Sequence, residues 1–181
     1  IRVWDFDKVE EHNIQNQIYT QKDLGRSKVS ALSRVIRNLG GQIKINESVV
    51  DDKTDLRGLV IVAVDSMKAR QEIFDACRFN WAVDYYIEAR MGGHLGMIFG
   101  LDPRNPESVD KYCQYFYADS DVTNPICATN ETVPALWYVA ASIAQFVLLY
   151  KQSIILKETY REGIINMNDQ PIVNFDAYVL I

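Results

Sequence analysis

A continuous run of apolar, mostly β-branched residues constrains the fold of this chain more than any other feature. Residues 56–66 read LRGLVIVAVDS. A strand that is apolar on both faces is typical of the interior of a parallel sheet, where helices cover both sides. The run ends in Asp65, which places an acid at the carboxyl end of the predicted strand. We therefore expect an α/β protein with at least one parallel pair of strands.

The segments around this run predict further strands and helices in alternation. Residues 25–41 and 67–80 have the three- and four-residue apolar spacing of amphipathic helices. Predicted strands cover residues 1–4, 42–50, two stretches of 84–103 separated by Gly92 and Gly93, and the tail 170–181. This order predicts an open α/β sheet, mostly parallel, with antiparallel additions towards the C-terminus and helices on both faces. We expect one domain over residues 1–181.

Two segments between these elements have unusual compositions. Residues 104–125 are polar, aromatic and flanked by prolines, and we expect a surface excursion there. Residues 132–150 carry no charge and are about long enough to span a bilayer. Pro134, Ser142 and Gln145 dilute the hydrophobicity of this stretch. A buried helix at the centre of an α/β layer is the expected interpretation, and we predict no membrane partner.

Charge and cysteine content exclude several classes of function. The formal net charge is -5, which argues against nucleic acid as the main partner, because phosphate binding needs a basic face. Cys77, Cys113 and Cys127 have no CxxC spacing, so they form neither a disulfide framework nor a zinc ribbon. A sparse, odd cysteine count fits a reducing compartment, and the expected location is the cytoplasm.

Acids at strand ends and a lysine at a helix start are the candidate functional residues. Ligands of open α/β sheets bind at the carboxyl ends of the strands, which places Asp5, Asp7 and Asp65 at one edge. A helix that begins near Gly25 would bring Lys28 to this edge. One acid would bind a ribose, another Mg²⁺, and the lysine phosphate oxygens. In the alternative interpretation, the acids cap neighbouring helices and Lys28 is a solvated surface residue.

Three stretches of the chain together form a recognisable pattern: VWDFDKVEEHNIQNQ, DLGRSKVSALSRVIRNLGG and VIVAVDSMKARQEI. Through these stretches the chain resembles the superfamily of ThiF, MoeB and ubiquitin-activating enzymes. The family pattern has a strand ending in D-x-D, then N-L-x-R-Q, then G-x-x-K, then a buried strand ending in Asp with an Arg beyond it. The positions that match, in order, are Asp5, Asp7, Asn13, Gln17, Gly25, Lys28, Asp65 and Arg70.

This resemblance implies a Rossmann-like fold and an ATP site with a Mg²⁺ ion. It implies that Asp5 binds the ribose, with Asp7 beside it, and that Lys28 contacts the phosphates. Asp65 would hold Mg²⁺, and Asn13 and Gln17 would line the nucleotide pocket. In the family, the D-x-D strand is the second one, after a first strand and a glycine-rich turn. The resemblance therefore implies that this sequence is truncated at its N-terminus.

The chain departs from the family pattern in two places. Asn16 stands where N-L-x-R-Q has its arginine, so one phosphate-binding charge is lost. The paired CxxC motifs are absent, which leaves Cys113 as at most a remnant, and we expect no zinc. Cys127 lies where the family's thiol nucleophile occurs when one is used, and a half-buried loop cysteine is the alternative. Cys77 is expected in the core.

Three functions remain open from the sequence. The resemblance implies ATP-dependent adenylation of the C-terminal glycine of a ubiquitin-like or sulfur-carrier protein, with possible thioester transfer to Cys127. Asn16 favours an alternative, a catalytically impaired relative that acts as a scaffold or partner subunit. A NAD-dependent oxidoreductase would also explain Asp5, but it leaves Lys28 without a role. Family habit implies a homodimer, with the apolar helix as the candidate interface.

Overall fold

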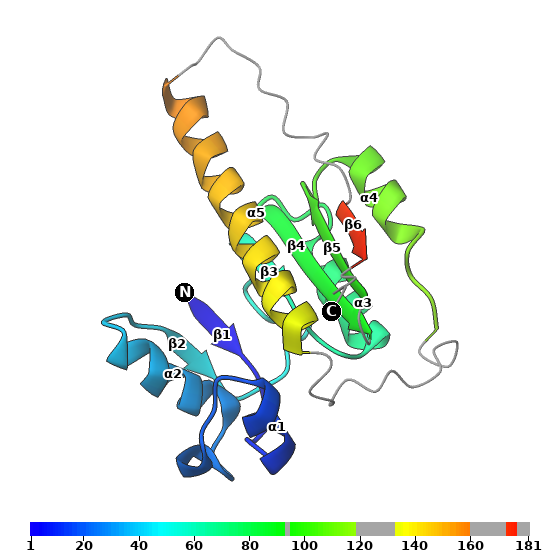
Figure 1. Cartoon of the computed structure of the whole chain (residues 1–181). Coiled ribbons are helices and arrows are strands. Elements are labelled where there is room, and N and C mark those ends of the chain that lie inside the picture. The colour runs from blue at the N-terminus through cyan, green and yellow to red at the C-terminus, as the bar shows by residue number, and fades with distance from the viewer. Residues whose placement is uncertain (93–94, 119–132, 160–172, 177–181) are drawn as a thin grey trace.

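A four-stranded sheet forms the larger part of the structure (Figure 1). The computed structural model describes residues 1–92, 95–118, 133–159 and 173–176. The strands of this sheet, in spatial order, are β3 (Gly58–Val62), β4 (Val83–Gly92), β5 (Leu95–Leu101) and β6 (Val173–Asp176). The β3–β4 pair is parallel, and β5 and β6 add antiparallel strands beyond it. The predicted α/β class, with its antiparallel additions, is confirmed.

Helices cover both faces of this sheet. Side chains of β4 alternate, so that Tyr86 faces a core cluster with α3 (Met67–Cys77) and α4 (Pro106–Cys113). Tyr85 faces the opposite cluster, which it shares with α5 (Val133–Thr159). Figure 1 shows α5 lying across its own face of the sheet. Gly100 on β5 permits this close approach, since a Cβ atom there would lie 2.7 Å from the Phe146 ring.

A second, two-stranded parallel sheet holds the N-terminal residues. It consists of β1 (Arg2–Trp4) and β2 (Lys44–Asn46), and α2 (Lys28–Asn38) contacts β2. Between β1 and α2 lie α1 (Glu11–Asn16) and a single 3₁₀ turn, η1 (Gln21–Asp23). The described strands thus divide into two sheets, because β1 pairs with β2 and β3 pairs with β4, and neither ladder joins β1 to β3.

Two serines set where the main helices begin. Ser27 caps α2 by accepting a hydrogen bond from the Ser30 N–H group, at 3.3 Å. Ser66 caps α3 in the same way through the Ala69 N–H group, at 3.2 Å. The start of α2 lies close to the carboxyl end of β1, because the Lys28 N–H group donates to the Asp7 carbonyl. The start of α3 lies close to the carboxyl end of β3, because only a few residues separate Val62 from Ser66.

Residues 104–125 are more ordered than the sequence indicated, as far as the structure describes them. Asn105 and Pro106 provide an N-cap and a first-turn proline, and they start α4. Val109 and Tyr112 on this helix are buried in the core cluster beneath β4. The expectation of a surface excursion is therefore wrong for residues 106–113, and residues 119–125 lie outside the described part of the chain.

The apolar helix α5 is buried on one face rather than all round. Ala135, Val139 and Phe146 pack onto the sheet, whereas Trp137 and Leu148 are 67% and 59% exposed. By length and composition, Val133–Gln152 is a candidate membrane span. Core helices of soluble proteins share this length and composition, and the prediction of no membrane partner stays a prediction.

Candidate functional site

The turn after β1 is held by its own two acids. The Asp5 carboxylate accepts a hydrogen bond from the Asp7 N–H group at 2.8 Å. The Asp5 N–H group donates to the Asn46 carbonyl at 3.2 Å, which continues the pairing with β2. The D-x-D sequence therefore forms a tight turn in which the Asp7 side chain is exposed to solvent.

Lys28 meets this turn from the first position of α2. Its ammonium Nζ lies 2.7 Å from Asp7 Oδ2, and its backbone N–H group donates to the Asp7 carbonyl at 2.8 Å. The Val9 N–H group donates to the Arg26 carbonyl at 2.8 Å, which aligns the two segments. Gly25, at φ 74°, makes the turn that allows this pairing.

The electrostatics of this contact favour an anion. Only 17% of the Lys28 side chain is exposed, against 48% for Asp7, so the ammonium sits in a partly shielded position. The positive end of the α2 helix dipole adds positive potential at the same place. The sequence predicted that the start of a helix would bring Lys28 to the strand ends. The structure confirms this for the end of β1, where Lys28 contacts Asp7.

The predicted pocket residues Asn13 and Gln17, on α1 and just after it, differ in their exposure to solvent. Asn13 is 3% exposed, and its Oδ1 accepts the Glu10 N–H group at 2.9 Å, so it caps the start of the helix. The Gln17 backbone N–H group donates to the Asn13 carbonyl, while the Gln17 side chain is exposed. Asn16 Oδ1 is buried without a hydrogen-bond partner in the structure. Their role in nucleotide binding stays a prediction.

Asp23 is a buried acid that the sequence analysis missed. Arg34 on α2 donates to both carboxylate oxygens, at 2.7 and 2.8 Å, and the Thr20 N–H and hydroxyl groups donate to Oδ2. Burial alone would raise the pKa of Asp23, but the hydrogen bonds from Thr20 and Arg34 outweigh it and lower the pKa. The T-x-x-D spacing of Thr20 and Asp23 was the available signal.

Asp65 lies at the end of β3, in the other sheet. It is exposed, directly precedes the Ser66 cap of α3, and makes no hydrogen bond to Asp5, Asp7 or Lys28 in the part of the chain that the structure describes. Within those same residues, no group of three potential metal ligands occurs. A single exposed carboxylate suits Mg²⁺, which takes one or two protein carboxylates together with phosphates and water.

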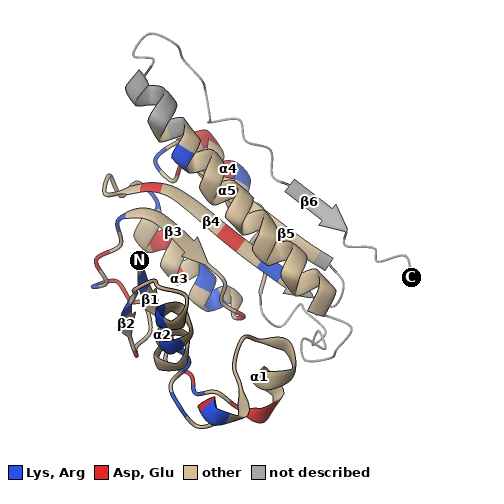
Figure 2. Ribbon diagram, turned by 60° about the vertical axis from the view of Figure 1, so that its left-hand side comes forward, with Lys and Arg blue, Asp and Glu red and all other residues tan. Residues whose placement is uncertain are grey.

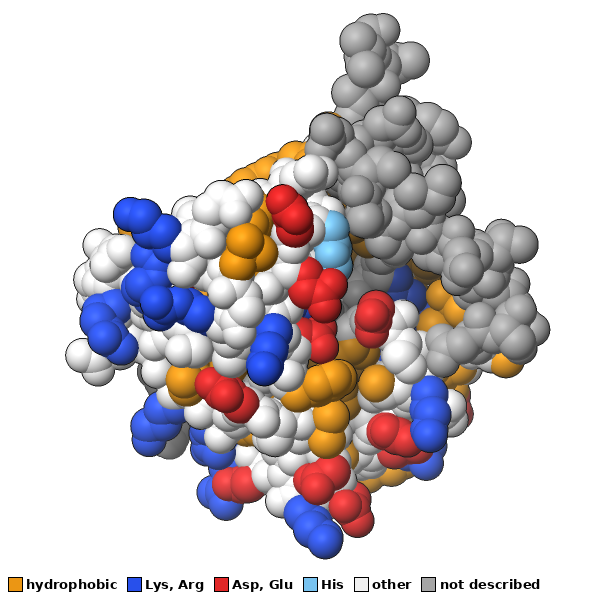
Figure 3. Space-filling view, turned by 90° about the horizontal axis from the view of Figure 1, so that it is seen from below, with side chains coloured by type: hydrophobic (Ala, Val, Ile, Leu, Met, Phe, Trp, Pro, Cys, Tyr) orange, Lys and Arg blue, Asp and Glu red, His pale blue; other side chains and the backbone are white. Residues whose placement is uncertain are grey.

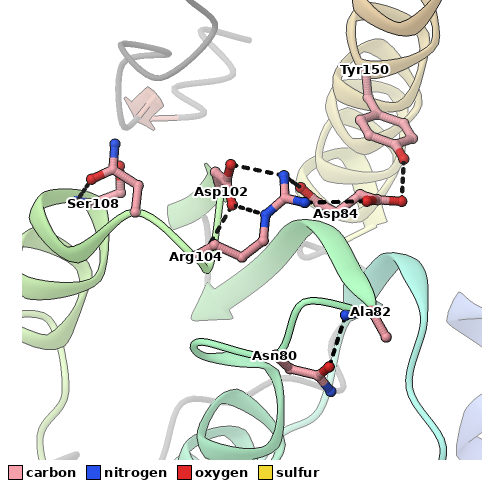
Figure 4. Close-up of polar contacts among 8 residues, drawn as sticks. Asn80, Ala82, Asp84, Asp102, Arg104, Ser108 and Tyr150 are labelled. Atoms are coloured by element: carbon pink, nitrogen blue, oxygen red, sulfur yellow. Dashed lines mark hydrogen bonds and ion pairs between the residues drawn. The ribbon is translucent and has the colours of Figure 1, made fainter.

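Polar residues at the start of β4 and the end of β5, the opposite end of the strands from Asp65, stabilise the structure. Figure 4 shows Arg104 between Asp102 and Asp84, with Tyr150 of α5 reaching the second of these acids. Arg104 Nε lies 2.8 Å from Asp102 Oδ1, and the Tyr150 hydroxyl donates to Asp84 at 3.3 Å. The hydrogen bond to Asp102 raises the pKa of Arg104. These contacts fasten α5 to the start of β4, away from Asp65.

The cysteines and histidines of the described residues are not poised for catalysis. Burial raises the pKa of Cys77 to about 12 and also raises the pKa of Cys113, so neither thiol is activated. The predicted core position of Cys77 is confirmed. His12 is exposed, and its Nδ1 lies 3.4 Å from Glu10 Oε2. Figure 3 shows acidic side chains beside a histidine on the face of the molecule that it draws. Cys127 and His94 lie outside the described residues.

An α/β sheet with a lysine at a helix start and acids at its strand ends is typical of proteins that bind nucleotides. Sequence comparison makes this more specific: the model of the ThiF family matches residues 1–170, and the chain belongs to the ThiF family. A comparison with curated protein sequences gave no match.

Solved structures of similar fold include Escherichia coli MccB in several complexes. MccB with AMPCPP and selenomethionine MccA has a TM-score of 0.57 at 16% identity, covering 82% of this chain and 48% of that chain. MccB with ATP has a TM-score of 0.52 at 18% identity, with the same coverage. MccB with MccA-N7isoASN has a TM-score of 0.56 at 17% identity, covering 82% of this chain and 49% of that chain. The chain spans about half the length of these structures.

Proposed function

We propose that the protein catalyses ATP-dependent adenylation of the C-terminal glycine of a ubiquitin-like or sulfur-carrier protein. Membership of the ThiF family supports this activity, as does the fold shared with MccB, which has been solved with ATP and with MccA. The observation that carries the proposal is the Lys28 ammonium, 2.7 Å from Asp7 at the start of α2. A fixed cation at the start of a helix suits the phosphates of a nucleotide.

The proposed reaction needs charge neutralisation more than it needs a base. A C-terminal carboxylate is already ionised at neutral pH, so it attacks the α-phosphorus of ATP directly, forming the acyl adenylate and releasing pyrophosphate. Lys28 offsets the growing negative charge on the phosphate oxygens, while Asp5 and Asp7 orient the ribose. Asn13 and Gln17 line the pocket. Asp65 would hold Mg²⁺, which when bound would neutralise negative charge on the phosphates.

Thioester formation is a proposed second step. The Cys127 thiolate would attack the acyl carbon of the adenylate, forming the carbon–sulfur bond as AMP leaves. Cys77 and Cys113 are unsuitable for this step, because burial raises the pKa of both thiols. We place this chemistry in one adenylation domain spanning residues 1–181, in the cytoplasm, where cysteines remain reduced.

We also propose that the protein is a homodimer joined through α5. The exposed face of this helix carries Trp137, Ala141, Ala144 and Leu148, and Figure 2 shows no charge along most of its length. The spacing of 4, 3 and 4 residues reads the same in both directions. In an antiparallel two-fold pair of helices, Trp137 would therefore meet the partner's Leu148, and the small alanines would meet each other.

A second candidate function follows from Asn16. Its Oδ1 is buried and unpartnered at the position where the family pattern has an arginine. A protein that lacks this phosphate-binding charge could bind nucleotide without turning it over and support an active partner subunit as a scaffold. Under this alternative, ATP binds but pyrophosphate does not exchange.

The decisive experiment measures ATP–pyrophosphate exchange by the complete natural protein with candidate carrier proteins. The wild type is expected to exchange, and Asp65→Ala to abolish exchange. Asp52→Ala removes another exposed acid from the loop before β3 and should leave exchange intact. Calorimetric titration with ATP and with NAD adds a check, since binding of NAD alone would favour an oxidoreductase. Exchange retained by Asp65→Ala would refute its role in binding Mg²⁺.

A further inference from the structure

Three charged side chains are buried together beneath the carboxyl end of β4. Arg70 comes from α3, and Glu88 and Arg90 come from β4; we call them the charge network. Their side chains are 5%, 0% and 8% exposed, respectively. Arg70 Nη1 lies 2.6 Å from Glu88 Oε1, and Arg90 Nε lies 2.5 Å from the same oxygen. One carboxylate oxygen thus orients two guanidinium groups.

Backbone carbonyls accept further hydrogen bonds from both arginines, while Arg90 Nη2 donates to Glu88 Oε2 and Arg70 Nε has no hydrogen-bond partner among the described residues. Arg70 donates to the Ala89 carbonyl at 3.0 Å and, through Nη2, to the Val64 carbonyl. Arg90 donates to the Tyr115 carbonyl at 2.5 Å. Each arginine therefore fastens one segment at this edge of the sheet to the shared Glu88. Arg70 fastens the end of β3, and Arg90 fastens the chain that follows α4.

The Arg70 contact leads directly to Asp65. The Val64 carbonyl and the Asp65 N–H group belong to the same planar peptide unit, so a hydrogen bond to this oxygen fixes the orientation of the peptide plane from which Asp65 continues. From the other side, the Arg70 N–H group donates to the Ser66 carbonyl at 3.1 Å. Asp65 is exposed, but its backbone is held on both sides by a single residue of α3.

Burying this network costs stability, because charges removed from water lose their hydration. Packed apolar residues of similar size are often as stable, so we look to the geometry that the network imposes for its role. The network holds two cations and one anion, so its geometry depends on the one carboxylate that both guanidinium groups share. If Glu88 loses its charge, the two guanidinium groups repel each other. This repulsion would weaken the hydrogen bond from Arg70 to the Val64 carbonyl.

We propose that Glu88 is a positioning residue for the nucleotide site: it holds Arg70, which fixes the Val64–Asp65 peptide and so sets the Asp65 carboxylate for Mg²⁺. This inference rests on the proposed function and deepens it. Glu88 touches neither nucleotide nor metal, and its effect passes through Arg70. Arg90 provides an internal comparison, since it shares Glu88 but does not contact Val64.

The test compares Glu88→Gln, Arg70→Lys and Arg90→Met in the complete natural protein. Calorimetry measures the affinity for ATP with Mg²⁺ and with EDTA, and thermal unfolding confirms that each variant folds. Glu88→Gln and Arg70→Lys should each reduce the Mg²⁺-dependent gain in ATP affinity about tenfold, the usual effect of losing a residue that orients a metal ligand. Affinity for ATP in EDTA should not change.

The Arg90→Met variant separates positioning from general stability. It breaks the same network on the other side, so we expect a lower unfolding temperature with an unchanged Mg²⁺-dependent gain. An equal loss in all three variants would overturn the proposal, because the network would then act only through stability. An unchanged gain in folded Glu88→Gln and Arg70→Lys would overturn it too.

The two proposals fail in different ways. If the wild type binds Mg²⁺ and ATP but does not exchange pyrophosphate, adenylation is refuted, and the calorimetric comparison still decides the role of Glu88. If the wild type exchanges pyrophosphate and Glu88→Gln keeps the full Mg²⁺ dependence, adenylation stands and the positioning role is refuted. A wild type with no Mg²⁺-dependent ATP binding would refute both.

Discussion

Lys28 and Asp7 are joined twice, once through their side chains at 2.7 Å and once through their backbones at 2.8 Å. The backbone contact fixes where α2 begins relative to the D-x-D turn, and it does not depend on which side chains are present. The side-chain contact can be exchanged, since a phosphate would compete with Asp7 for the same ammonium group. The pair therefore combines a fixed frame with a replaceable anion.

Replacing Lys28 tests this frame. Lys28→Met keeps the backbone contact and removes the charge, so we expect pyrophosphate exchange to fall about 100- to 1,000-fold, as for other groups that stabilise charge in a transition state. Lys28→Arg should retain part of the activity. Lys8→Met removes an exposed cation from the segment that follows the D-x-D turn and should change exchange less than about twofold. Unaltered exchange in Lys28→Met would refute its contact with phosphate.

Restoring an arginine at position 16 should strengthen nucleotide binding. Asn16→Arg adds a guanidinium where the family pattern has one, and one charge-assisted hydrogen bond to phosphate corresponds to about tenfold tighter binding of ATP. Calorimetry measures the change. Asn38→Arg adds the same charge at the far end of α2 and serves as the control. If both variants bind ATP equally tightly, net charge rather than position explains the gain.

Gly100 should resist any larger side chain. A Cβ atom would lie 2.6 Å from the Tyr85 hydroxyl and 2.7 Å from the Phe146 ring, so Gly100→Ala is expected to lower the free energy of unfolding by about 1–3 kcal/mol. Among the described residues, the buried Tyr85 hydroxyl has no hydrogen-bond partner, so Tyr85→Phe alone should be nearly neutral. Urea unfolding of the double variant should recover part of the loss, and full additivity would contradict this packing.

Asp23 should make stability sensitive to acid. Its pKa in the folded protein lies below the ordinary value of 3.8, so its contribution is present above that value and is lost as the pH falls through the folded-state pKa. We expect the free energy of unfolding to drop below about pH 4 in the wild type and to drop less in Asp23→Asn. Asp52→Asn changes an exposed acid and should retain the full acid sensitivity.

The exposed face of α5 should control the oligomeric state. Light scattering is expected to report a dimer for the wild type and a monomer for Ala141→Glu, because a charge at the centre of an apolar contact is costly to bury. Gln152→Glu introduces the same charge beyond this face and should leave the dimer intact. A monomeric wild type at micromolar concentration would contradict the proposed interface.

Periodicity predicted most individual elements, and the rule that ligands gather at strand ends predicted that Lys28 lies near the end of β1. The continuous run at β3 and the helix patterns of α2 and α3 appear where expected, since each depends on neighbours in the sequence. Burial on both faces of β3 is only partial, because Ile61 is 47% exposed. Strand order is set by long-range pairing, so the division into two sheets was not visible in the sequence.

Buried charges were the main omission. Glu88 and Arg90 lie two residues apart within an apolar strand, a spacing that places both side chains on one face. The sequence thus contained a signal that they share surroundings, but the partner on α3 became visible only when the strand and helix packed together. Asn105 and Pro106 were similarly readable as a helix start, and the aromatic residues after them obscured it.

The division into two sheets affects how quickly backbone amide protons exchange with deuterium. Among the described strands, β4 and β5 have hydrogen-bonded neighbours on both sides, whereas β1 and β3 each pair along one side only. Amides on an unpaired side are open to solvent, while those between two neighbours exchange only when the sheet itself opens. The slowest-exchanging amides should therefore lie in β4 and β5, and protection on the open sides of β1 and β3 would reveal that another strand had come to lie there.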